Sequence, residues 1–288
     1  MTAAVGPRVV CIGGGHGLAA TLRAAAAYAG DLTGIVSVAD DGGSSGRLRS
    51  ATGLPAMGDI RRCLSALADP AVPLASVFEY RFEGDGEGHA LGNLLIAALA
   101  DRSGSFTDAV AYLGDLLGII GEVLPATEEL VDLCAATANG TVRGQVAVQQ
   151  SIGIERVWLD PPSPSAPKRA LAALETADQV VMGPGSLFTS VLAALAVPQI
   201  RDAVAAAPGR KIYVCNLRPQ PPETSGFDVA AHVRALRDAG IAPDVVLCEP
   251  GSLALGDHDA EVVEAPVAAA HGLAHDAARL GAALAGLL

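Results

Sequence analysis

The sequence is poor in aromatic and in basic residues, and both shortages exclude classes of protein. Phe, Trp and Tyr make up 3% of the 288 residues, and 19 Lys and Arg stand against 31 Asp and Glu, a formal net charge of −12. Nucleic acids and anionic membranes are bound by basic surfaces, and single-stranded nucleic acids also by stacked aromatic rings. We therefore expect no nucleic-acid partner.

Long apolar runs and paired cysteines are also missing. No stretch reaches 18 consecutive apolar residues, so the sequence predicts no transmembrane helix and no membrane insertion. The N-terminus lacks the pattern of a signal peptide. The five cysteines are scattered, odd in number and never in a CxxC spacing, which is typical of reduced thiols and indicates no zinc site. We expect a cytoplasmic protein.

Three catalytic motifs are absent. The sequence has no GxxxxGK[ST] loop, no HExxH and no GxSxG nucleophile elbow. These absences argue against a P-loop enzyme, a zinc protease and a hydrolase with a serine nucleophile.

What is present is an apolar chain with the rhythm of an α/β fold. Apolar residues make up 51%, and short β-branched runs alternate with longer Ala/Leu segments, which is typical of βα units on a parallel sheet. Strands are predicted at 8–12, 33–38, 179–182, 211–216 and 245–248, and helices at 18–28, 58–68, 92–101, 107–117, 229–239 and 275–287. We expect one domain, 1–288, with a Rossmann-like three-layer parallel sheet.

The pattern changes between about residues 120 and 160. Short extended pieces are predicted at 121–125, 129–137, 141–149 and 156–159, and Asn139-Gly140 is a hairpin turn signal. We interpret this stretch as an inserted small antiparallel subdomain.

The first candidate site is a glycine loop, Gly13 to Gly17, between a predicted strand and a predicted helix. Glycines let backbone amides approach a phosphate, and the start of a helix adds partial positive charge. A tight turn without a ligand is the alternative. Leu18 stands where the third glycine of a dinucleotide GxGxxG would be, so this loop indicates NAD only weakly.

The second candidate is the loop Asp40–Gly46 with Arg47, at the carboxyl end of the next predicted strand. Asp40 and Asp41 suit Mg²⁺ or a ribose hydroxyl, whereas Ser44, Ser45 and Arg47 suit phosphate. A plain turn with a solvated pair of charges is the alternative.

Other candidates precede helices or end strands. Gly185 and Ser186 form a second strand–glycine–helix junction, and Asn216 ends a strand. Two further sites are open to two interpretations: His89 and Asn93 before a helix could be structural or part of the site, and Asp59 could be no more than a helix cap.

Charge is unevenly distributed along the chain. Residues 1–62 hold six basic and four acidic residues, whereas the remaining 226 hold 13 basic and 27 acidic ones. Both glycine loops lie in this basic segment, which favours a small phosphorylated ligand.

At these residues the chain resembles a known family. GGGHGL, VADDGGSSGRLR, GDIRRCLSALA, GHALGNLL, GPGSLFTS and NLRPQPPETSGF occur in the order found in YvcK-like gluconeogenesis factors, which are related to CofD 2-phospho-L-lactate transferases. The resemblance covers roughly residues 8–280. It implies a cytoplasmic, homodimeric regulator that binds a UDP-sugar such as UDP-N-acetylglucosamine, linked to carbon metabolism, cell-wall synthesis and cell shape. The alternative is a metal-dependent transferase acting on a phosphorylated substrate.

The resemblance also implies which residues form the site. The nucleotide would be bound by Gly14, Gly15, His16, Gly17, Asp40, Asp41, Ser44, Ser45, Arg47, Asn93, Gly185, Ser186 and Asn216. Catalytic residues stay unassigned, and no cofactor is implied except Mg²⁺, which Asp40 and Asp41 would hold in the transferase alternative. Ala274 precedes His275-Asp276 where the family usually has Arg.

Overall fold

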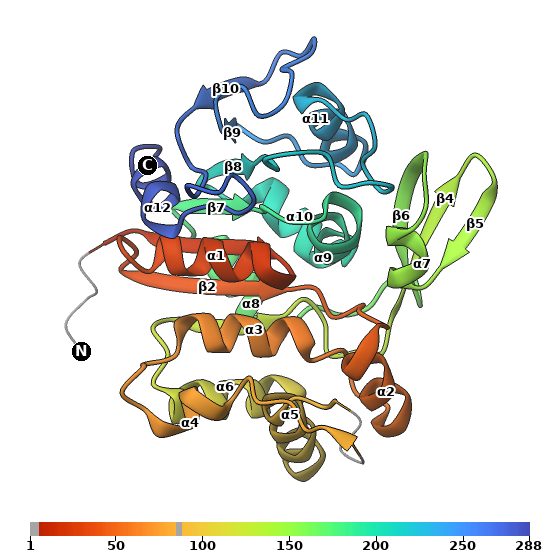
Figure 1. Cartoon of the computed structure of the whole chain (residues 1–288), viewed down its shortest axis with the longest axis vertical. Coiled ribbons are helices and arrows are strands. Elements are labelled where there is room, and N and C mark those ends of the chain that lie inside the picture. The colour runs from red at the N-terminus through yellow and green to blue at the C-terminus, as the bar shows by residue number, and fades with distance from the viewer. Residues whose placement is uncertain (1–5, 85–87) are drawn as a thin grey trace.

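The centre of the molecule is a seven-stranded sheet in which all neighbouring strands run parallel (Figure 1). The computed structural model describes residues 6–84 and 88–288. The strands are β1 (Arg8–Gly13), β2 (Asp31–Val36), β3 (Glu122–Pro125), β7 (Gln179–Met182), β8 (Arg210–Val214), β9 (Val245–Cys248) and β10 (Glu261–Glu264). Their order across the sheet is β10-β9-β8-β7-β1-β2-β3.

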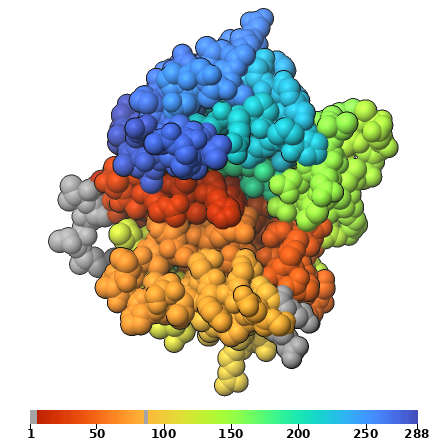
Figure 2. Space-filling model, viewed as in Figure 1, coloured from red at the N-terminus to blue at the C-terminus, as the bar shows by residue number. Residues whose placement is uncertain are grey.

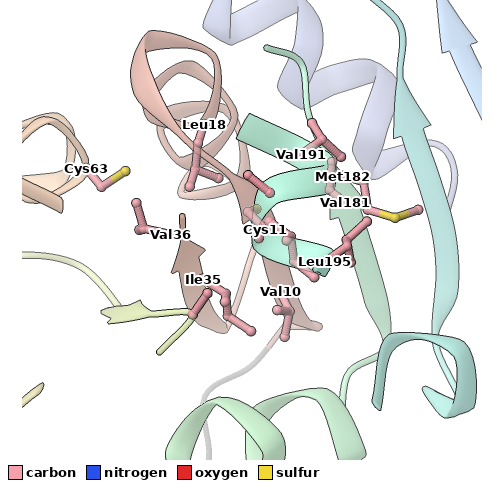
Figure 3. Close-up of a cluster of buried hydrophobic side chains, with 14 of the residues drawn as sticks. Val10, Cys11, Leu18, Ile35, Val36, Cys63, Val181, Met182, Val191 and Leu195 are labelled. Carbon is pink, nitrogen blue, oxygen red and sulfur yellow. The ribbon is translucent and has the colours of Figure 1, made fainter. Parts of the chain in front are cut away.

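Helices cover both faces of this sheet, which explains why its central strands are apolar throughout rather than alternating. On one face, α1 (Gly15–Ala25) packs between α3 (Gly58–Leu67) and α12 (Ala277–Ala285). On the other lie α8 (Lys168–Glu175), α9 (Leu192–Leu195) and α10 (Pro198–Ala206). Figure 3 shows Leu18 of α1, Leu195 of α9 and Val181 of β7 gathered around β1. The three-layer prediction is confirmed.

Further helical segments belong to the main body. They are α2 (Gly43–Thr52), α4 (Pro73–Val77), α5 (Leu91–Ser103), α6 (Phe106–Leu117), a π-helical turn η2 (Leu187–Val191) and α11 (Val229–Asp238). In the described part of the chain no single helix is long and apolar enough to cross a membrane; Leu187–Leu195 and Pro198–Ala206 reach that length only together, bent by 82°. All five cysteines are buried and free.

The order of the strands reverses at β1. The chain adds β2 and β3 on one side of it and β7 to β10 on the other. In an open parallel sheet, such a switch point leaves a crevice outside the carboxyl ends of the two diverging strands, here β1 and β7.

A smaller sheet is inserted between β3 and β7 and stands at one side of the main body in Figure 1. Its strands β4 (Asp132–Thr137), β5 (Gly140–Arg143) and β6 (Ile154–Asp160) are antiparallel, in the order β5-β4-β6. The turn between β4 and β5 lies at the predicted hairpin signal. The short helix α7 (Gln145–Gln149) follows β5.

Three local predictions are wrong. Residues 121–125 belong to the main sheet, because β3 pairs in parallel with β2 as its edge strand. Residues 141–149 are not extended throughout: α7 begins at Gln145, and the N–H of Val146 in its first turn donates a hydrogen bond to a carboxylate oxygen of Asp41. The loop after β2 is shorter than predicted, because α2 already begins at Gly43.

Candidate ligand-binding site

The two glycine loops at the switch point touch each other. Ile12 of β1 pairs with Met182 of β7, so Gly13–Gly17 and Gly183–Ser186 leave the sheet side by side. A Cβ on Gly17 would overlap the carbonyl oxygen of Pro184, so only glycine allows this approach. Thr21 of α1 ties the loops together, since its Oγ1 donates to the Gly183 carbonyl over 2.7 Å.

A polar cavity of about 350 Å³ lies over the start of α1. Its size is within the range of small-molecule sites. Its walls are formed by Gly14, Gly15, His16, Gly17, Asp40, Asp59, Arg62, Gln145, Gln149, Gly185, Ser186, Thr189, Ser190 and Gln220. Backbone N–H groups at a helix N-terminus attract anions, so this wall suits a phosphate.

The neighbouring carboxylates Asp40 and Asp41 point to different places. Asp40 lines the polar cavity, and its Oδ1 accepts from the Gly42 N–H over 2.9 Å. Asp41 borders a separate hollow with Arg47, and its Oδ1 accepts from the Val146 N–H over 2.9 Å. The structure therefore does not bring this pair together around one ligand atom.

Asp59 is the carboxylate that shares the cavity with Asp40. It is 7% exposed, pairs with Arg62 (Oδ1 to Nη1, 2.6 Å) and accepts from the Gly15 N–H. Burial raises the pKa of Asp59, and the negative charge of Asp40 raises it further. Its side chain does not cap α3, so the cap-only interpretation of Asp59 is wrong. In the sequence, the feature that could have indicated a site role for Asp59 is its position at a helix start next to Arg61 and Arg62.

The other candidates of the second loop form a buried polar network beside the cavity. Ser44 Oγ lies 2.8 Å from His89 Nδ1, and Asn93 Nδ2 donates to the same Oγ over 3.2 Å. Arg61, 2% exposed, donates to Asn93 Oδ1 over 3.2 Å and to Glu79 over 3.1 Å. Ser45 Oγ lies against Gly58 at the start of α3. Sequence reasoning did not anticipate that Arg61 would be buried.

A second, more apolar cavity of about 380 Å³ adjoins the first at His16, Gly17, Gly185 and Gln220. Its remaining lining is Ala20, Pro184, Asn216, Leu217, Arg218, Pro219, Pro221, Leu273, Ala274 and His275. Asn216 connects two parts of its lining, because its Oδ1 accepts a hydrogen bond from the Gly185 N–H over 3.1 Å and its Nδ2 donates one to Gln220 over 3.3 Å.

The loop after β8 is held over the second cavity by Glu223. One carboxylate oxygen accepts from the N–H groups of Phe188 (2.7 Å) and Thr189 (3.0 Å), at the start of η2. Burial raises the pKa of Glu223. His275 borders the same cavity; its Nε2 is buried without a hydrogen-bond partner in the described part of the chain, and burial lowers the pKa of its imidazole.

Fold and site together define a doubly wound α/β protein with a two-compartment cleft at its switch point. The chain belongs to the family described as 2-phospho-L-lactate transferase CofD, whose model matches residues 9–282. 

Relatives in other bacteria are similar over most of this chain. The gluconeogenesis factor of Bacillus subtilis (strain 168) is 41% identical over 234 residues, 80% of this chain and 74% of that protein. A Nostoc sp. (strain PCC 7120) relative is 46% identical over 235 residues, 80% of this chain and 52% of the relative, so the chain spans about half of that protein's length.

A solved structure has the same fold. The crystal structure of a UPF0052 family member from Bacillus halodurans is similar with a TM-score of 0.92 and 33% sequence identity, and the match covers 97% of this chain and 99% of that one.

Proposed function

We propose that this protein binds a nucleoside diphosphate sugar, a UDP-sugar such as UDP-N-acetylglucosamine, and acts as a regulator without turning it over. The observation that carries the proposal is the junction of two unlike compartments at Gly17 and Gly185. The polar compartment over α1 suits a diphosphate. The adjoining one, with Leu217 and Leu273, suits the uracil and ribose.

The names of the relatives support the regulatory part of the proposal. Relatives at 40–41% identity are called gluconeogenesis factors, which favours a role in carbon metabolism. The link to cell-wall synthesis and cell shape follows from the same proposal, because a nucleotide sugar is a building block of the wall and a suitable signal of its supply.

Isothermal titration calorimetry with UDP-N-acetylglucosamine tests this proposal. We expect saturable binding. Chromatography of the same sample should show that the nucleotide has not been consumed. The Asn216→Ala variant, which releases Gly185 and Gln220, should bind at least about fivefold more weakly, since about 1 kcal/mol is a typical hydrogen-bond loss. An absence of heat with every UDP-sugar at millimolar concentration would refute the proposal.

A metal-dependent transferase is the second candidate, favoured by the carboxylates of Asp40 and Asp59 in one cavity wall and by the name of the family. Mg²⁺ is commonly held by one or two carboxylates together with substrate phosphates. The described residues contain no group of three or more His, Cys, Asp or Glu that could hold a metal. These two carboxylates would therefore hold Mg²⁺ only with oxygens from the ligand, and the ion would supply charge neutralisation there.

Asp59→Asn distinguishes the two candidates, with Asp41→Asn as the matched control. If the protein is a transferase, Mg²⁺ strengthens nucleotide binding in the native protein and in Asp41→Asn but not in Asp59→Asn. If it is a metal-free regulator, Mg²⁺ has no effect in any of the three. Calorimetry with and without Mg²⁺ measures this difference.

A further inference from the structure

A third cavity continues from the polar compartment along the groove between α1 and α3. It has a volume of about 440 Å³, and His16 and Arg62 line both it and the polar compartment. Figure 1 shows α1 and α3 lying side by side, and Figure 2 shows the same face with its side chains. Neither the sequence motifs nor the proposed nucleotide site assigns a role to this groove.

The groove concentrates positive charge in an acidic protein. Four arginines line it, whereas Glu79 is the only acidic residue among the described residues of its lining; the four are Arg23, Arg61, Arg62 and Arg81. They come from three separate parts of the chain: α1, α3 and the segment before α5. The chain as a whole has a net charge of −12, so the excess of positive charge in this groove is opposite in sign to the net charge of the protein.

Among the residues that the structure describes, two of these four arginines have no carboxylate partner. Arg61 is paired with Glu79 and Arg62 with Asp59. Arg81 donates only to a carbonyl, that of Gly88, over 2.9 Å, and Arg23 is exposed; within residues 6–84 and 88–288 neither forms an ion pair with a carboxylate.

The guanidinium groups of Arg61, Arg62 and Arg81 are close enough to repel one another. The charges of Arg62 and Arg81 both lower the pKa of Arg61, in addition to the larger effect of its burial. Solvated arginines that merely cover a helix surface would spread apart in water. Here the fold fixes Arg61, because its guanidinium donates hydrogen bonds to Glu79 and Asn93. Clustered like charges facing a cavity are typical of a ligand site.

We propose that the groove between α1 and α3 is an anion subsite, formed by Arg23 and Arg81, that binds an acidic substituent on the sugar of the bound nucleotide. The inference rests on the proposed function and adds to it a preference among nucleoside diphosphate sugars: one that carries an acid group should bind more tightly than a neutral one of the same size. With the diphosphate over the start of α1, the sugar passes His16 and enters the groove. Arginine forks suit carboxylate and phosphate oxygens.

UDP-glucuronate and UDP-glucose provide a matched pair of probes, because they differ only in a carboxylate in place of a hydroxymethyl group. We expect the native protein to bind UDP-glucuronate at least about fivefold more tightly, as for a partly exposed charge pair. The ratio of the two affinities should fall in Arg23→Gln and in Arg81→Gln and approach one in the double variant. Arg102→Gln, an exposed arginine of α5 outside the groove, serves as the control. Equal affinities in the native protein, or a ratio that the double variant retains, would overturn the subsite.

A second titration separates this inference from the proposed function. Inorganic pyrophosphate is titrated into the native protein and the double variant. If neither UDP-sugar binds but pyrophosphate binding weakens in the double variant, the subsite is supported and the nucleotide-sugar function is wrong. If UDP-sugars bind, yet neither the glucuronate preference nor pyrophosphate binding changes in the double variant, the function is supported and the subsite is wrong. Identical pyrophosphate isotherms without UDP-sugar binding overturn both.

Discussion

The two glycine-rich loops after β1 and β2 differ in what they offer to a ligand. The loop Gly13–Gly17 has one side chain besides glycine, that of His16, and lines both compartments of the cleft. The loop Asp40–Gly46 is rich in carboxylates and hydroxyls, yet of these only Asp40 lines the polar cavity.

The two loops differ because the polar side chains of the second loop are hydrogen-bonded to other parts of the protein. Asp41 holds α7, and Ser44 is bonded to His89 and Asn93. Farther along α2, Arg49 pairs with Asp132 at the start of β4. These side chains attach α2 and the inserted sheet to the main body, whereas four residues of the glycine loop, Gly14 to Gly17, line the polar cavity. A loop dense in polar side chains is thus as well suited to holding elements together as to binding a ligand.

The largest effect is expected from replacing a glycine of the first loop, Gly13–Gly17. In Gly17→Ala the new methyl group would overlap the Pro184 carbonyl and push the loops apart. We expect a loss of stability of about 1–3 kcal/mol and nucleotide binding weakened at least about tenfold. Urea unfolding and calorimetry measure both. Gly286→Ala, where a methyl group would meet nothing closer than 3.5 Å, is the control and should be neutral.

Ser44→Ala should affect stability alone. Removing the hydroxyl leaves the buried amide of Asn93 short of an acceptor, at a cost of about 1–2 kcal/mol. Ser50→Ala on the same helix removes an exposed hydroxyl and should cost less. If nucleotide affinity falls in Ser44→Ala while stability is kept, the second loop contacts the ligand and the contrast between the loops fails.

Substitutions of the neighbouring carboxylates Asp40 and Asp41 should have different effects on stability and on nucleotide affinity. Asp41→Asn weakens the hydrogen bond to α7 and should cost about 0.5–1 kcal/mol of stability, with nucleotide affinity kept. Asp40→Asn removes a negative charge from the cavity wall, so nucleotide binding without divalent ions should strengthen about threefold. Equal effects of both changes on affinity would contradict the assignment.

A modest, pH-dependent effect is expected in the loop that carries Gln220. Because burial raises the pKa of Glu223 above its unfolded value, its ionisation disfavours the folded state. Its contribution to stability is complete below the unfolded pKa and is lost as pH rises through the folded pKa. Glu223→Gln does not ionise, so its melting temperature relative to the native protein should increase between pH 4 and pH 7, by about 2–4 °C if 1 kcal/mol is involved. A constant difference across this range would show that Glu223 does not titrate there.

Much of the fold could be predicted because its signals are local. Apolar runs such as Val9–Ile12 mark strands buried on both faces, and glycines after a strand mark the carboxyl edge where Gly185 lies. The loop after β1, Asp40 and Asn216 could be placed near one crevice for the same reason.

The fate of the second loop could not be predicted, because it depends on contacts with distant residues. The partner of Asp41 is 105 residues away in sequence, and those of Ser44 are 45 and 49 residues away. No local pattern distinguishes a carboxylate that faces a ligand from one that holds a helix. Likewise, Arg61 and Arg62 are adjacent in sequence, and only packing decides that Arg61 is buried.

His16 borders all three cavities at the first turn of α1. A molecule that fills more than one of them would pass this residue. A change of side-chain size at this one position is therefore expected to alter three neighbouring cavities at once, and with them the fit of any ligand that spans them.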